Sequence, residues 1–118
     1  MKLQINGQQL RLRVDEDELR RLLGGDALAN HTMLPGGAAF RLLLALGPDT
    51  QASVVVDGAA AWRITLPTNA IDGYVARLPC RDGLEFVLPV GEGSLLGMTF
   101  EVDVRDSVRQ RGAKSRHP

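Results

Sequence analysis

The chain opens with KLQINGQQLRLRV, Lys2 to Val14, in which apolar and polar residues alternate on both sides of Asn6-Gly7. Asn-Gly is the strongest short-range signal for a two-residue hairpin turn, because both turn positions need a positive φ. With Asn6-Gly7 as the loop, the predicted core-facing side of the hairpin consists of Met1, Leu3, Ile5, Leu10 and Leu12. The outward side consists of Lys2, Gln4, Gln9, Arg11 and Arg13. The chain is therefore predicted to open with a half-buried hairpin that has a basic outer surface.

A short helix over residues 15–23 is predicted next, in VDEDELRRLLGG. Asp15 as the N-cap and Glu18 three residues later form a capping-box pattern, and Gly24-Gly25 stops the helix. The apolar stripe of this helix consists of Leu19, Leu22 and Leu23. Neighbouring carboxylates can bind a metal, but the helix dipole alone accounts for the acids at this N-terminus.

The rest of the chain predicts strands divided by turn residues. Four segments suggest a four-stranded meander: ALANHTML, AAFRLLLAL, QASVVV and AAWRITL. A second short helix is expected over 67–76, followed by strands at Leu84–Val90 and Gly97–Val104. The prediction is a mainly β domain of about seven or eight short strands with one or two short helices. It forms either a single antiparallel small barrel or a two-layer sheet.

The chain of 118 residues, 44% hydrophobic and 24% charged, has the size and composition of one globular domain, placed at residues 1–104. Residues 105–118 are predicted to form a disordered basic tail. The longest apolar run, Leu42 to Leu46, is too short to span a bilayer, and the N-terminus lacks the apolar block of a secretory signal. These features predict a cytoplasmic protein without a membrane partner.

Charge is distributed unevenly along a chain of formal net charge zero. The tail carries one acid, Asp106, and the five basic residues Arg105, Arg109, Arg111, Lys114 and Arg116. That tail is +4, so the rest of the chain is −4. Together with Lys2, Arg11 and Arg13, the tail residues are candidate contacts to nucleic acid.

Candidate catalytic chemistry is sparse. Cys80 could act as a nucleophile, with Arg81 favouring the thiolate and His31 as a base, but the chain has no recognisable cysteine-enzyme signature. One cysteine and two distant histidines do not give a zinc spacing, so no metal or cofactor is expected. The glycines in GEGSLLG, residues 91–97, lack the Walker lysine and are better explained as a β turn. The chain is therefore not expected to be an enzyme.

Aromatic residues are few, which disfavours a stacking platform for single-stranded nucleic acid. Most of them are expected in the core, and they are Phe40, Trp62, Tyr74, Phe86 and Phe100.

Three segments, MKLQINGQQLRLRVDEDEL, LPTNAIDGYV and GLEFVL, resemble a family of small uncharacterised bacterial β-rich proteins, a domain of unknown function. Its members open with a Met-Lys strand and an Arg-Leu-Arg-Leu strand, followed by an acidic helix start. The likeness is clearest over residues 1–23, and PVGEGSLLGMTFEVDV departs from the family's ending. The resemblance implies a β-rich architecture. The family has no established activity, so it supplies no site residues.

The leading hypothesis is a non-catalytic protein-interaction module that forms homo-oligomers or binds another protein. The segments RLLLAL and SVVV are apolar on both faces, so some side chains must be covered by the helices or by another subunit. The candidate oligomer surface consists of Leu42, Leu43, Leu44 and Leu46. The alternative is a nucleic-acid-binding small barrel of the Sm-like or OB-like kind that uses the hairpin arginines and the tail.

Overall fold

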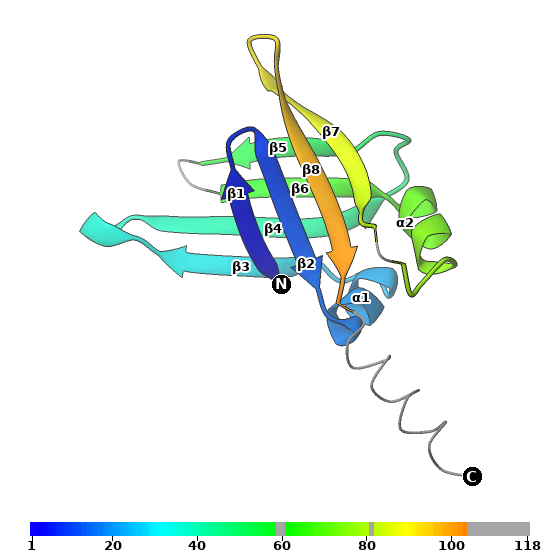
Figure 1. Cartoon of the computed structure of the whole chain (residues 1–118). Helices are drawn as coiled ribbons and strands as arrows, with labels where there is room; N and C mark the ends of the chain where they lie inside the picture. The colour runs from blue at the N-terminus through cyan, green and yellow to red at the C-terminus, as the bar shows by residue number, and fades with distance from the viewer. Residues whose placement is uncertain (59–60, 81, 104–118) are drawn as a thin grey trace.

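The computed structural model describes residues 1–58, 61–80 and 82–103, so the predicted tail and its basic residues lie outside the described part of the chain. The described residues form two four-stranded sheets and two helices (Figure 1). Sheet A has the order β1 (Lys2–Asn6), β2 (Gln9–Val14), β8 (Ser94–Val102), β7 (Leu84–Gly91). Sheet B has the order β3 (Leu28–Met33), β4 (Ala39–Gly47), β6 (Ala61–Pro67), β5 (Ser53–Asp57). Helix α1 spans Glu16–Leu23 and helix α2 spans Thr68–Val75, with a 3-10 turn η1 at Pro35–Gly37.

The mainly β prediction is confirmed, and of its two forms the structure adopts the two-layer sheet. The predicted meander is wrong, because β6 lies beside β4 in parallel and β5 occupies the sheet edge. The second sheet repeats this arrangement, with β2 parallel to β8 at its centre. Central positions suit the strands with the most deeply buried side chains, among them Leu42 and Leu44 on β4 and Ile64 and Leu66 on β6, all 0% exposed. Burial of these side chains therefore favours a parallel central pair over a simple meander.

The first hairpin forms as predicted, but its turn lies one residue further along the chain. Residues 7–8 make the turn, Gly7 has a φ of 59°, and Ile5 faces Leu10 rather than Gln8. The shift moves each cross-strand partner by two residues, so every side chain keeps its predicted face. Gly7 alone accommodates the positive φ, which explains why glycine rather than asparagine sets the turn.

The two halves of the chain repeat one topology. In each half a hairpin leads into a helix and then into a second hairpin, and the two hairpins of a half belong to different sheets. The pairing registers correspond: Leu10 faces Met98 and Leu12 faces Phe100 in sheet A, as Trp62 faces Leu42 and Ile64 faces Leu44 in sheet B. The fold is therefore a twofold repeat of β-β-α-β-β, with hairpins exchanged between the sheets.

The two helices close one end of the space between the sheets. Asp15 caps α1 in the predicted capping box, with the Glu18 backbone N–H donating to Asp15 Oδ1 at 2.7 Å. Leu22 of α1 is buried, as predicted, whereas Leu23 is 42% exposed; Ile71 of α2 is also buried. Both helices lie near the C-terminal ends of the central strands (Figure 1).

Tyr74 of α2 packs edge-on against Phe100, with ring centroids 6.1 Å apart. Burial raises the pKa of the Tyr74 hydroxyl above its ordinary value of 10.0, and a hydrogen bond with the Val102 backbone offsets part of that rise. The helix-capped end is thus part of the buried core. No helix in the described residues is long and apolar enough to cross a membrane.

Candidate functional site

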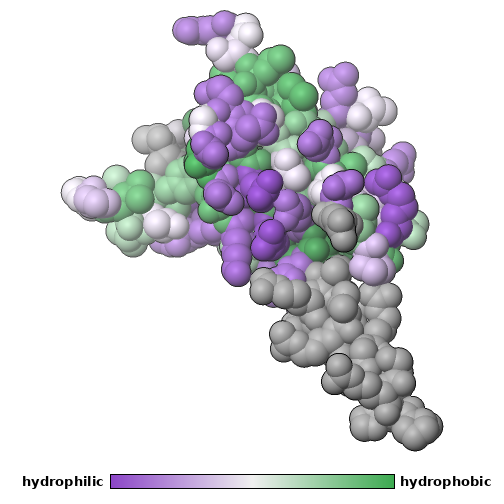
Figure 2. All heavy atoms as spheres, viewed as in Figure 1, coloured by the Kyte–Doolittle hydropathy of each residue, from purple (hydrophilic) through white to green (hydrophobic). Residues whose placement is uncertain are grey.

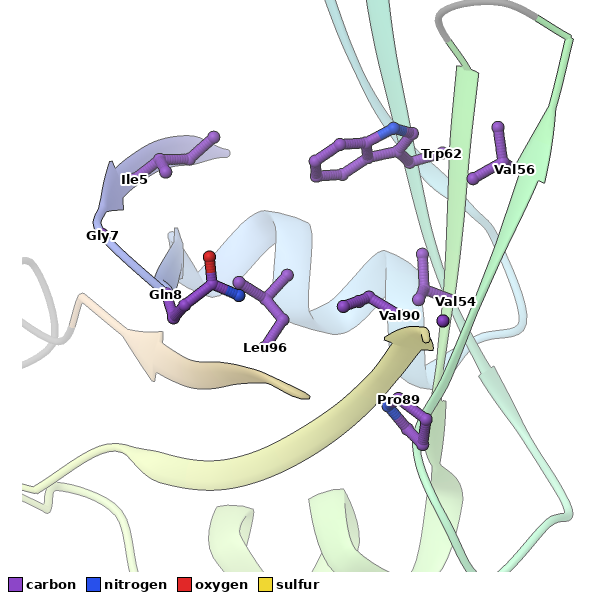
Figure 3. A pocket seen from close by; sticks show the side chains of 10 residues that line it. Ile5, Gly7, Gln8, Val54, Val56, Trp62, Pro89, Val90 and Leu96 are labelled. Carbon is purple, nitrogen blue, oxygen red and sulfur yellow. The ribbon is translucent and has the colours of Figure 1, made fainter. Parts of the chain in front are cut away.

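An apolar cleft opens between the sheets near the hairpin turns, away from the helices (Figure 3). The cleft has a volume of about 600 Å³ and is partly open to solvent. Its walls come from both sheets, and the lining residues are Ile5, Gly7, Gln8, Val54, Val56, Trp62, Pro89, Val90, Gly91 and Leu96. A space of this size, lined mainly by apolar side chains, is within the range of binding pockets.

Ile5 and Trp62 reach toward each other from opposite walls of the cleft (Figure 3). Trp62 also packs edge-on against Phe40, with ring centroids 5.1 Å apart, which holds the indole in place at the wall. Ile5 is 56% exposed and Val56 is 63% exposed, although both lie on the inward side of their strands. These side chains are directed at the core but lie where the sheets have separated too far to bury them.

The cleft carries no ionisable side chain among its lining residues. Among its lining residues, Trp62 has an indole N–H and Gln8 has an amide, whose Nε2 donates to the Leu95 carbonyl oxygen at 3.0 Å. This hydrogen bond joins the β1–β2 turn to β8 and fixes one rim of the cleft. The site therefore offers apolar contact and shape, without groups for acid–base or nucleophilic chemistry.

Two backbone features form the opposite rim. A register shift interrupts the β7–β8 pairing between Pro89 and Gly91, and the following turn has positive φ at Gly91, Glu92 and Gly93. Irregularities of this kind bend a strand locally. The glycine-rich segment is thus a β turn, as the sequence predicts. Pro89 and Val90 consequently lie beside Val54 of sheet B (Figure 3).

The predicted oligomer surface does not form one patch. Leu42 and Leu44 are 0% exposed in the chain's own core, so they are not on a surface, and the prediction for these two is wrong. Leu43 is half-buried on the outward side of β4, while Leu46 is half-buried against the core. The alternation along the strand separates these neighbours, because successive side chains point to opposite faces.

The basic hairpin face forms as predicted, but its arginines have partners. Arg11 Nε lies 3.0 Å from Glu101 Oε1, and Arg13 Nη2 lies 2.9 Å from Glu101 Oε2. Lys2 is exposed on the same face. Figure 2 shows the surrounding surface over β1, β2 and β8 as largely hydrophilic. Glu101 neutralises part of the positive charge that phosphate binding through this face would need.

Cys80 and His31 occupy different surroundings. Cys80 is half-buried and packs against the hydrophobic core, whereas His31 is exposed on β3. Among the described residues, no group of three or more His, Cys, Asp or Glu side chains could hold a metal ion.

Sequence reasoning missed the cleft residues Ile5, Val56 and Val90. Each lies within three residues of a hairpin turn, at the end of an apolar strand. That position is a usable signal, since strand ends near turns extend beyond the centre of a two-sheet core.

Comparisons with protein-family models, curated proteins and solved structures returned no match.

Proposed function

We propose that this protein is a non-catalytic interaction module that self-associates by covering the apolar cleft of one copy with that of another. The observation that carries the proposal is the exposure of Ile5 and Val56, each more than half exposed in an uncharged concavity. Apolar side chains gathered in a partly open concavity gain free energy when a partner excludes water from them.

A second copy is a suitable partner because the patch is neutral. Two identical charged surfaces repel each other, but the uncharged cleft lining can face its own copy without that cost. Further exposed apolar side chains lie where β3 leads into the turn before β4: Met33 at 66% and Leu34 at 45%. They would extend the contact beyond the cleft itself.

The cleft supplies fewer residues than the 20–30 that a standard stable interface uses on each side. We therefore expect a reversible dimer with a dissociation constant on the order of micromolar. The non-catalytic part of the proposal is supported by the cleft's chemistry, because the polar groups of its lining side chains are the Trp62 indole N–H and the Gln8 amide, which is already hydrogen-bonded.

The direct test is sedimentation equilibrium of the full chain from roughly micromolar to hundreds of micromolar, a range chosen around the expected constant. The expected result is a mass that rises from monomer to dimer, with no weakening in high salt, because apolar association is not screened. A monomer across the whole range would refute self-association. A dimer that dissociates in salt would assign the contact to charged surfaces instead.

A further inference from the structure

The outward face of sheet B carries two arginines that have no salt-bridge partner among the described residues. Arg41 on β4 and Arg63 on β6 are exposed and form no salt bridge with any described residue. His31 faces Arg41 across the β3–β4 pair. Leu43 and Val55 flank Arg63 on the two neighbouring strands, and Val55 is 59% exposed. The described side chains of this face are therefore both cationic and apolar.

Because the two halves of the chain repeat one topology, positions on sheet B can be compared with their counterparts on sheet A. Arg63 occupies the position on β6 that Arg11 occupies on β2, and Arg11 is paired with Glu101. The position on β4 that corresponds to Glu101 on β8 is Ala45. Glu85 of β7 likewise corresponds to Ala29 of β3. Sheet A thus carries acids at two outward positions where sheet B has alanine.

We propose that the outward face of sheet B docks an acidic segment of a partner protein. The partner's carboxylates would take the place that Glu101 holds on sheet A, bound by Arg41 and Arg63. Apolar side chains of the segment would cover Leu43 and Val55. Guanidinium groups bind carboxylates through paired hydrogen bonds, so this substitution uses the same chemistry across the interface.

The geometry suits an extended segment. Arg41 and Arg63 belong to adjacent side-chain rows, one paired with Ala61 and the other with Leu43. Rows on one face of a sheet are about 6.6 Å apart along the strands, which is also the spacing of every second residue in an extended peptide. Acids two residues apart in the partner would therefore meet the two arginines.

An acidic protein segment fits better than nucleic acid for two reasons. No aromatic ring points outward from the described part of sheet B, since Phe40 and Trp62 both lie on the inward side. The described part of this face therefore offers no aromatic ring on which a base could stack. In addition, residues outside the tail carry a net charge of −4, which opposes a long polyanion more than a short one.

This face lies on the opposite side of sheet B from the cleft, so the inference does not depend on self-association. The experiment is fluorescence anisotropy of the full chain with a short labelled peptide in which Glu and Val occupy every second position and Ser the positions between, so that Glu and Val share one face of the extended peptide. The double variant Arg41→Ala/Arg63→Ala is compared with Arg11→Ala/Arg13→Ala. Both lose two positive charges, so the pair controls for net charge.

We expect the sheet B variant to weaken peptide binding about tenfold and the sheet A variant to change it less than about twofold. Equal weakening by both variants, or no binding to the unaltered chain, would overturn the proposal.

Two further probes are the same peptide with Lys in place of Glu and a labelled oligothymidylate. Equally tight binding of the lysine peptide would exclude charge recognition. Oligothymidylate binding through the same arginines would assign the face to phosphate.

Discussion

Replacing Val56 with Glu tests the self-association proposal at the centre of the cleft. Val56 and its neighbour Val55 are consecutive on β5 and similarly exposed, at 63% and 59%, yet they point to opposite sides of sheet B. Val56→Glu places a carboxylate in the cleft, whereas Val55→Glu places the same group beside Arg63 on the outward face. The two variants have the same composition and charge, so their comparison isolates the surface involved.

The expected effect follows from the exposed fraction of Val56. Burying a whole valine side chain contributes about 1.5 kcal/mol, so covering the 63% that remains exposed contributes about 1 kcal/mol. A twofold dimer contains two such side chains, which gives about 2 kcal/mol, or roughly a 30-fold change in the dissociation constant. Desolvating the new carboxylate adds to this loss. Val55→Glu should change the constant less than about twofold.

Sedimentation equilibrium of the unaltered chain and both variants at matched concentrations measures the constant directly. We expect Val56→Glu to be monomeric where the unaltered chain and Val55→Glu are dimeric. Ile5→Glu, on the opposite wall, should behave like Val56→Glu. If Val55→Glu dissociates the dimer and Val56→Glu does not, the reasoning is wrong and the contact lies on the outward face of sheet B.

Three further predictions concern the helix cap, the buried tyrosine and the hairpin arginines. Asp15→Ala should lower the free energy of unfolding by about 1 kcal/mol in urea titrations, whereas Asp15→Ser should retain most of it. Because burial raises the Tyr74 pKa above 10.0, the unfolded chain loses the hydroxyl proton at a lower pH than the folded chain. The free energy of unfolding should therefore not depend on Tyr74 below pH 10.0 and should fall above it. Tyr74→Phe should remove that part of the fall, measured by thermal unfolding at alkaline pH. Glu101→Gln removes the charged partner of Arg11 and Arg13, and it should leave the anisotropy of a labelled oligonucleotide unchanged if this face does not bind nucleic acid. Salt-dependent binding that tightens about threefold would instead assign nucleic-acid binding to the hairpin arginines.

The positions of the elements could be predicted because local chemistry sets them. The capping box at Asp15 and Glu18 satisfies backbone groups within one helical turn, and the structure shows both of its hydrogen bonds. The glycine-rich turn at 91–93 likewise depends on backbone conformations that its own residues permit. Signals of this kind need no knowledge of the rest of the fold.

Strand pairing could not be predicted in the same way, because it depends on segments far apart in the chain. The meander prediction places β5 between β4 and β6, but the burial of Leu44 and Ile64 favours a direct pair of these two strands. The same limitation affected the leucine run on β4. The sequence shows that its residues alternate between faces, but not that Leu42 and Leu44 face inward and Leu43 outward.

The twofold repeat allows the outward faces of the two sheets to be compared position by position. Both sheets place an arginine at the same position of a central strand, Arg11 and Arg63, so the scaffold itself does not require an ion pair there. On sheet A, Glu101 neutralises part of the positive charge of an outer surface that is hydrophilic. On sheet B the corresponding residue is Ala45, and the charge of Arg63 lies beside the apolar side chains of Leu43 and Val55. A solvated face gains little from exposed leucine and valine, while a docking face gains from both features. The asymmetry therefore supports the proposal that sheet B, rather than the arginines of the opening hairpin, binds a charged partner.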